Sequence, residues 1–338
     1  MMSARNRVDV RRSKKVTIFG GLAAATMLMG ACSSTSSAAS TSTTATPSTT
    51  TTSVSLSSLL PASIRSSGII KNGTPEANPP LIFLTPNQSL TGIDFELSNA
   101  VGKELGVKFQ YTQIPFPGDI PAILSGRIDT SWGIFSDTPQ RESEVTFVDY
   151  IIDGVTFLTK YGNPDNISAL SDLCGKSLGA TQGAIESAFI TQLTTTYCTP
   201  NGKPAITPSL YSSAAASLLA LTSGRVAAIV HPGAASQYIA STAGGGKTYQ
   251  ILFPGKLFLA NYGGIGVAKG DTQLANALVT ALRALQKNGT YGKILAKYGL
   301  SRMALTANQI SINAASKIPL TPAQQKIYGT SSPYITAK

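Results

Sequence analysis

This 338-residue sequence has few of the residues that usually carry catalysis or bind metals. It contains one His, three Cys and only 13% charged residues. A single His excludes metal sites built from His clusters and argues against Ser-His-Asp or Cys-His nucleophiles. Three Cys are too few for a small disulfide scaffold. Because hydrophobic residues reach 42%, a wholly disordered chain is also excluded. We expect neither a metal nor a cofactor.

The net charge of +11 is concentrated at the N-terminus. Six cations less Asp9 supply +5 before residue 16: Arg5, Arg7, Arg11, Arg12, Lys14 and Lys15. The remaining +6 is spread over the rest of the chain, without a basic run or interleaved aromatic residues. Nucleic-acid binding surfaces gather their Lys and Arg on one face. The sequence therefore predicts no nucleic-acid partner.

The first 32 residues have the layout of an export signal. A cationic stretch is followed by the apolar run Val16–Ala31 and then by Cys32. This run is too short and too rich in Gly and Ala for a membrane span, which needs about 20 apolar residues. Gly30-Ala31-Cys32 resembles a bacterial lipobox, which implies removal of residues 1–31 and lipidation of Cys32. We expect a lipid-anchored protein on the outer face of the cell membrane.

Three alternatives stay open for this segment. It could be a single-span anchor or the signal of a plain secreted protein. Arg11-Arg12 leaves twin-arginine export open beside the general secretory route.

Residues 33–58 are almost entirely Ser, Thr and Ala, so no apolar surface offsets the entropy of ordering them. We expect residues 32–62 to be a tether, whose glycosylation the sequence does not decide.

After residue 63 the pattern alternates between strands and helices. Apolar residues recur at helical spacing over residues 93–105, 185–197, 274–285 and 291–298. Short apolar runs at 81–84, 107–111 and 128–132 predict strands between helices. Gly106 and Gly299 follow helices, where Gly is a common stop. This alternation indicates an α/β fold with mainly parallel sheets.

One short segment occurs twice in similar form. Residues 123–129 (ILSGRID) resemble residues 221–227 (LTSGRVA), and in each a helix is predicted to end at Gly before a strand. The similarity has two interpretations, a common helix-stop device or two similar α/β lobes on either side of a cleft.

Cys174 and Cys198 flank one predicted helix. With Cys32 assigned to lipidation, an exported pair most simply forms a structural disulfide. Closing this loop would stabilise the fold by roughly 3 kcal/mol in the chain-entropy model.

Several motifs run in order from about residue 70 to 313, and the main ones are Ser89–Leu97, Phe116–Ile123, Ser136–Arg141, Leu173–Gly179 and Asn288–Leu295. Together they resemble bacterial solute-binding proteins of family 3, the extracytoplasmic receptors of polar amino-acid ABC importers. The resemblance implies a type II periplasmic-binding-protein fold, with a cleft between two lobes joined by two hinge strands. Lobe 1 would be residues 63–153 and 258–312, and lobe 2 residues 154–257. Residues 313–338 would form a loosely attached C-terminal tail.

The resemblance also implies a function and partners. The protein would capture a small polar solute, an amino acid or related carboxylate, by hinge closure and deliver it to the ABC transporter permease. We expect a monomer that is not an enzyme. Two alternatives remain, namely a ligand sensor without a transporter and a dehydratase-like enzyme on the same fold.

Arg141 is the strongest candidate for ligand binding. Thr138 suits a helix N-cap and Pro139 the first helical position, so Arg141 falls in the first turn. A cation there opposes the helix dipole, which indicates that the site receives an anion. The family's matching Arg binds the ligand α-carboxylate. Ser136 and Phe116 match ligand contacts of the family.

A turn in lobe 2 would complete the carboxylate site. Gln182, Gly183 and Ala184 match a family turn whose backbone N–H groups face the ligand at a helix start. Ala184 replaces the usual Thr hydroxyl, so only its backbone contribution is expected, and Thr181 or Gln182 could substitute for the hydroxyl.

Two positions depart from the family pattern. Asn78 stands where an aromatic often stacks on the ligand, and His231 stands where Asp or Glu usually holds the α-ammonium. His231 can also be read as a structural His at a strand end. Because residues 227–233 contain no acid, Glu76, Asp137 and Glu186 are the carboxylates that could act instead.

Overall fold

The computed structural model describes residues 56–74, 78–322 and 324. The predicted signal segment, Cys32, most of the predicted tether and Glu76 lie outside these residues. In the described part of the chain, no helix combines the length and apolar character needed to cross a membrane. The same residues contain no group of three or more His, Cys, Asp or Glu side chains arranged to hold a metal ion.

One set of elements comes from both ends of the described chain and makes lobe 1. In chain order they are η1 (Leu56–Leu59), α1 (Ala62–Ser67), β1 (Ile69–Thr74), β2 (Phe83–Leu84), β3 (Leu90–Thr91), α2 (Ile93–Leu105), β4 (Lys108–Gln113), η2 (Phe116–Gly118), α3 (Asp119–Leu124), β5 (Thr130–Ser136), α4 (Pro139–Glu142), α8 (Thr272–Lys287), α9 (Thr290–Lys297) and η7 (Ser301–Met303).

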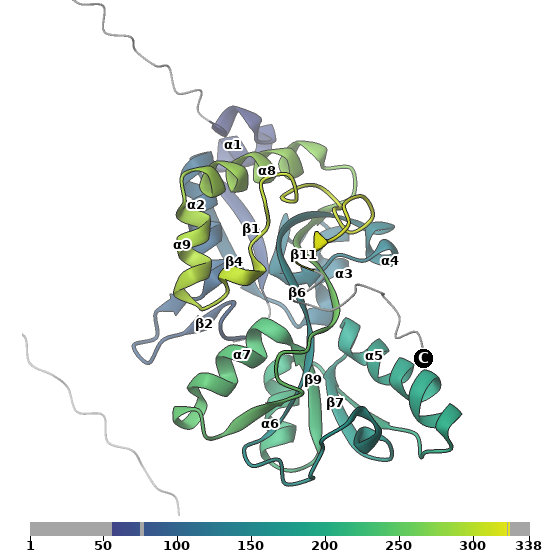
Figure 1. Cartoon of the computed structure of the whole chain (residues 1–338). Helices are drawn as coiled ribbons and strands as arrows, with labels where there is room; N and C mark the ends of the chain where they lie inside the picture. The colour runs from purple at the N-terminus through teal and green to yellow at the C-terminus, as the bar shows by residue number, and fades with distance from the viewer. Residues whose placement is uncertain (1–55, 75–77, 323, 325–338) are drawn as a thin grey trace, which may run out of the picture. The chain divides into compact units, whose positions relative to one another are not determined.

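The middle of the chain makes lobe 2, and two long strands join the lobes. The lobe 2 elements are η3 (Leu170–Leu173), β7 (Ser177–Thr181), α5 (Ile185–Leu193), η4 (Thr194–Cys198), η5 (Thr199–Asn201), β8 (Thr207–Tyr211), α6 (Ala214–Thr222), β9 (Ala228–Pro232), α7 (Gly233–Thr242), η6 (Ala243–Gly245) and β10 (Tyr249–Leu252). The joining strands are β6 (Val145–Lys160) and β11 (Phe258–Ala268). Figure 1 shows them between α2, α8 and α9 of lobe 1 and α5, α6 and α7 of lobe 2.

The sheet runs through both lobes. Its strand order is β4-β1-β5-β11-β6-β9-β7-β8, and β10 also pairs with β6. The outer strands are parallel, as β1 is to β4 and β5, and as β7 is to β8 and β9. The joining strands pair in antiparallel fashion with their neighbours. The predicted parallel pairing therefore holds within each lobe but not where the lobes meet.

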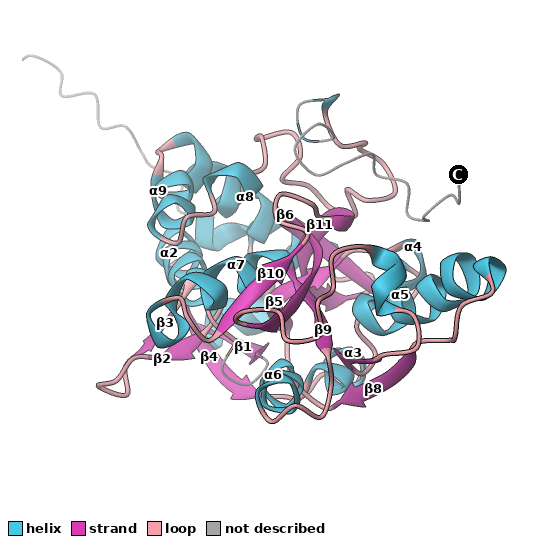
Figure 2. Ribbon diagram, turned by 60° about the horizontal axis from the view of Figure 1, so that its bottom comes forward, coloured by secondary structure: helices cyan, strands magenta, loops and turns pink. Residues whose placement is uncertain are grey.

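Each lobe has apolar clusters on both faces of its strands. Figure 2 shows the helices that flank the strands. In lobe 1, α2, α8 and α9 cover one face and the shorter α3 covers the other. In lobe 2, α5 covers one face, and α6 and α7 cover the other. Trp132 is 1% exposed and makes edge-to-face contacts with Phe109 and Tyr150 at ring-centroid distances of 5.6 and 5.5 Å. Burial of apolar surface stabilises the fold by roughly 25 cal/mol for each Å² removed from water.

The repeated segment predicts equivalent units in the two lobes. Gly126 follows α3 with φ 68°, and Gly224 follows α6 with φ 73°. In both places a left-handed glycine ends the helix and leads into a strand, β5 in lobe 1 and β9 in lobe 2. The strands that follow also take equivalent places, since β5 lies parallel beside β1 as β9 does beside β7. This equivalence favours two similar lobes over a common helix-stop device alone.

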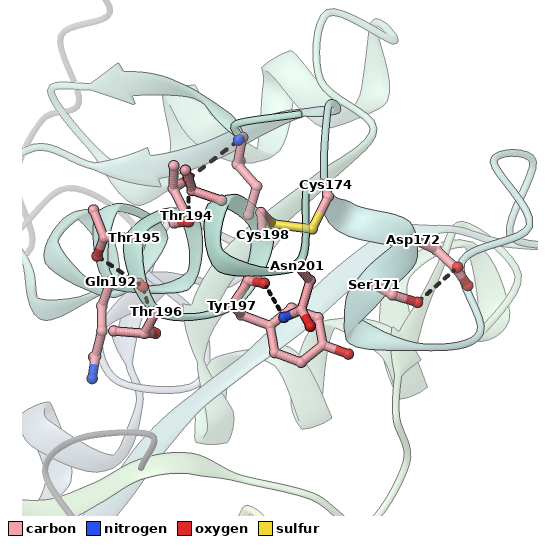
Figure 3. Close-up of a disulfide and its surroundings, with 12 residues drawn as sticks. Ser171, Asp172, Cys174, Gln192, Thr194, Thr195, Thr196, Tyr197, Cys198 and Asn201 are labelled. Carbon is pink, nitrogen blue, oxygen red and sulfur yellow. Dashed lines mark hydrogen bonds between the residues drawn. A yellow bond between two sulfur atoms is a disulfide. The ribbon is translucent and has the colours of Figure 1, made fainter. Parts of the chain in front are cut away.

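The predicted disulfide is present in lobe 2. Cys174 follows η3 and Cys198 ends the π-helical turn η4, and their sulfur atoms are bonded across a sequence separation of 24 residues. Figure 3 shows the bond joining these two short helical segments. Cys198 is buried in the apolar cluster beneath α5. The bond therefore ties the end of η3 to the core of lobe 2.

The two ends of the folded body differ from expectation. Leu60, assigned to the tether, is fully buried in the lobe 1 core, so packing begins before residue 62. The expectation of a loose tail is wrong for residues 313–320. The backbone N–H of Ala314 donates to the Asp149 carboxylate at 2.7 Å, Asn313 bonds to Phe147, and Leu320 is buried. Backbone hydrogen bonds and apolar burial fix this segment to lobe 1.

Candidate ligand-binding site

A small cavity of about 60 Å³ lies where the two lobes meet. Its walls come from lobe 1, from the joining strands and from lobe 2. Four of the predicted ligand-binding residues line it: Asn78, Phe116, Ser136 and Ala184. We call it the charged cavity, because two carboxyl groups, Asp153 and Glu186, also line it. Its volume suits a few water-sized groups.

Arg141 is held beside this cavity by the helix start that the sequence predicts. Thr138 is the N-cap of α4, and its hydroxyl accepts a hydrogen bond from the Arg141 N–H at 3.3 Å. The guanidinium stacks over the ring of Phe135 at 4.7 Å from the centroid and over Phe116 at 5.4 Å. A guanidinium clamped between a helix start and two rings has little freedom left to lose when an anion binds.

The same guanidinium connects the two lobes. Nη1 donates to the carbonyl oxygen of Ser136 in lobe 1, and Nη2 donates to that of Gly183 in lobe 2, both at 2.9 Å. Burial lowers the pKa of Arg141 to about 10, and the carboxyl of Glu186 opposes that shift. Arg141 therefore remains a cation near neutral pH.

The turn in lobe 2 lies close to Arg141 but differs in detail from expectation. Ala184 lines the charged cavity and is the N-cap of α5, yet its N–H donates to Thr181 within the turn at 3.2 Å. Gly183 contributes a carbonyl acceptor to Arg141. Gln182 is exposed, and its N–H bonds to Tyr211 in the neighbouring strand. The structure therefore places Gln182 and Gly183 outside the lining of this cavity.

Glu186 and Asp153 are the two acids of the charged cavity. Glu186 lies in the first turn of α5, and burial raises its pKa to about 7. Asp153 lies on β6 where the lobes meet, and burial raises its pKa to about 7 as well. The backbone N–H groups of Gly154 and Ala234 donate to its carboxyl and partly offset this rise in pKa. Both carboxyls would be better accommodated with a cation beside them.

Of these two acids, sequence reasoning named Glu186 and missed Asp153. The available signal was an acid inside the apolar run of residues 150–158. Asp137, also named as a candidate, does not line the charged cavity. Its carboxylate accepts the N–H of Ala315 at 3.1 Å, and burial with the adjacent Asp149 raises its pKa to about 9. Asp137 therefore faces the C-terminal segment of lobe 1.

His231 is not in the charged cavity. Side chains alternate along β9, so Pro232 faces that cavity and His231 faces the other side of the sheet. His231 is buried, and its Nδ1 lies 3.2 Å from the Ser236 hydroxyl on α7. Burial lowers its pKa to about 4, so the ring is neutral at physiological pH. His231 instead lines a second, larger cavity with Asn78.

Residues 70–301 match the family model of bacterial extracellular solute-binding proteins, family 3. The chain belongs to this family. The L-arginine-binding protein of Pseudomonas aeruginosa is 28% identical over 249 residues, which cover 72% of this chain and 93% of that protein.

Solved structures show the same two-lobed fold. An ancestral arginine-binding protein bound to glutamine is 30% identical, with a TM-score of 0.60, covering 68% of this chain and 97% of that one. An ancestral amino-acid-binding protein described as a precursor of cyclohexadienyl dehydratase is 26% identical, with a TM-score of 0.61, covering 70% of this chain and 97% of that one. The family and the two-lobed fold thus agree with a cavity that lies where the two lobes meet.

Proposed function

We propose that this protein is the extracytoplasmic receptor of an ABC importer and binds an amino acid between its lobes. One observation carries the proposal: Arg141 lies at the junction of the lobes, beside a cavity lined by Asp153 and Glu186. A zwitterion needs both a cationic and an anionic partner once it leaves water. The similarity to the L-arginine-binding protein of Pseudomonas aeruginosa supports an amino-acid ligand.

In this proposal the ligand carboxylate binds Arg141 and the Ser136 hydroxyl. The guanidinium exchanges the carbonyl oxygen of Gly183 for a charged acceptor, which makes the stronger hydrogen bond. The α-ammonium binds Glu186 and Asp153. These two acids replace the Asp or Glu that family members usually have at the position of His231. Phe116 flanks the ligand while it holds the Arg141 guanidinium in place.

Closure follows from the way the lobes are joined. A Cβ added at Gly154 would lie 2.8 Å from the carbonyl oxygen of Phe258, so the two joining strands pack closely at the predicted hinge. A ligand that contacts both lobes favours the closed arrangement by its extra contacts there. Solution scattering should show a smaller radius of gyration with ligand than without, and an unchanged radius would contradict capture by hinge closure.

The direct test is a thermal-shift screen of purified protein with the twenty amino acids, small carboxylates and polyamines, followed by calorimetry on each hit. We expect an amino acid to stabilise the protein. The alternative function is a dehydratase, because one similar structure is a precursor of cyclohexadienyl dehydratase. Mass spectrometry of the ligand after incubation with the protein tests this alternative. A receptor returns its ligand unchanged, whereas a dehydratase returns a product.

The remaining part of the proposal concerns location and partners. Lipidation of Cys32 would hold the receptor at the outer face of the membrane, as a monomer that meets the permease subunits there. Cys32→Ala should release the protein into the medium. Retention of a fully cleaved mutant on the membrane would contradict the anchor without affecting the ligand proposal.

A further inference from the structure

A second cavity of about 270 Å³ adjoins the charged cavity. Asn78 of lobe 1 and Ala214 of lobe 2 line both cavities, so the two share a wall at the junction of the lobes. The second cavity extends from there between α6 and α7, over His231 on β9. It has more than four times the volume of the charged cavity.

The walls of the second cavity are mostly apolar. Leu218 and Ala215 of α6, Ile239 of α7 and the side chain of Tyr249 line it, and among the lining residues described there is no Asp, Glu, Lys or Arg. We therefore call it the uncharged cavity.

The side chains of Tyr249, Thr222 and His231 in its walls have hydrogen-bond partners. The Tyr249 hydroxyl lies 2.5 Å from the Thr222 hydroxyl, and His231 Nδ1 lies 3.2 Å from the Ser236 hydroxyl. Burial keeps the His231 ring neutral at physiological pH, because it lowers the pKa to about 4. A charged side chain entering this cavity would find no ion partner on the described walls.

We infer that the uncharged cavity receives the side chain of the ligand and selects an amino acid whose side chain carries no charge. The inference rests on the proposed function, which places the carboxylate and ammonium in the charged cavity. Because the two cavities share Asn78 and Ala214, a ligand held by Arg141 can extend from one into the other. The apolar walls then favour aliphatic, thioether or aromatic side chains over guanidinium, ammonium and carboxylate groups.

Calorimetry with pairs of amino acids of similar shape and different charge tests the inference. The pairs are citrulline and arginine, norleucine and lysine, and glutamine and glutamate. We expect the uncharged member of each pair to bind roughly tenfold or more tightly than its charged counterpart. Equal or tighter binding of the charged members would overturn the inference and leave the proposed function intact. Binding of no amino acid at all would overturn the proposed function and the inference with it.

A designed carboxylate tests whether the side chain enters this cavity. Ala215 is exposed and lies at the second position of α6, where the helix dipole favours an acid. Ala215→Asp should shift the ratio of arginine to citrulline affinity toward arginine by roughly tenfold. Ala216→Asp is the matched control, because it adds the same charge one position along the helix, outside both cavity linings. Equal ratios in the two variants would contradict the inference.

Discussion

The charged and uncharged cavities share a wall, yet they differ in almost every physical property. The charged cavity is small and adjoins the fixed guanidinium of Arg141, with two buried acids in its lining. The uncharged cavity is larger, and its described walls carry a neutral His and mainly apolar side chains. In our proposal the two cavities have separate tasks: the charged cavity binds the carboxylate and ammonium that all amino acids share, and the uncharged cavity distinguishes their side chains.

Loss of Arg141 should have the largest effect on binding. Arg141→Ala removes the partner of the carboxylate, and truncation of one member of a buried charged pair typically costs about 2–5 kcal/mol. Calorimetry on the best ligand measures the loss. Arg225→Ala removes an exposed arginine of lobe 2 and should leave the affinity unchanged. Wild-type affinity in Arg141→Ala would contradict the proposal that Arg141 binds the ligand carboxylate.

The disulfide should affect stability without affecting selectivity. Cys174→Ser with Cys198→Ser opens a loop whose closure contributes about 3 kcal/mol, which lowers the melting temperature by several degrees. Neither cysteine lines either cavity. The ratio of citrulline to arginine affinity should therefore match that of the wild type, as calorimetry below the melting temperature can determine. A changed ratio would mean that the cavities depend on the fold of this distant turn.

Removing the acids should separate recognition of the ammonium from that of the carboxylate. Glu186→Gln and Asp153→Asn keep the shape of each side chain and remove its charge. Each should weaken amino-acid binding by about 1.5–3 kcal/mol, the usual range for a hydrogen bond to a charged group. The matched control is the analogue of the ligand that lacks the amino group. In both variants the affinity for this analogue should fall less than the affinity for the amino acid. Equal losses for the amino acid and this analogue would show that the acids do not contact the ammonium.

Binding should release protons, and the charged cavity should be their source. Burial raises the pKa of both Asp153 and Glu186 to about 7, and a bound ammonium would lower both values. Affinity for an amino acid should therefore rise between pH 6 and pH 8, by at most about tenfold per pH unit for each proton released. His231, with a pKa of about 4, stays neutral across this range. Calorimetry in buffers of different ionisation enthalpy counts the protons, and proton uptake would contradict the assignment.

The local features that the sequence predicts well are those set by neighbouring residues. The N-cap Thr138 and the helix start at Pro139 place Arg141 where the structure has it, because capping depends on only a few residues. Gly106 ends α2 in the left-handed conformation for the same local reason. The cysteine pairing followed from the small number of cysteines and the predicted export.

Features that depend on distant packing could not be predicted in this way. His231 and Pro232 are adjacent on β9, and a shift of one residue exchanges the faces of a strand. Only the three-dimensional structure shows that Pro232 lines the charged cavity and His231 the uncharged one. Asp153 became a candidate only when β6 brought it beside Glu186. The sequence does not predict the attachment of the segment after residue 312, because that attachment depends on Asp149, far away in the sequence.

The most direct test of the account compares the best-binding amino acid with its own decarboxylated amine, by calorimetry on the wild-type protein. The amine keeps the ammonium and the side chain and loses only the group assigned to Arg141. The account predicts that the amino acid binds and that the amine binds roughly thirtyfold or more weakly, in line with the loss of a buried charged pair. Comparable affinities for the two compounds would contradict the central claim that Arg141 binds the carboxylate between the lobes.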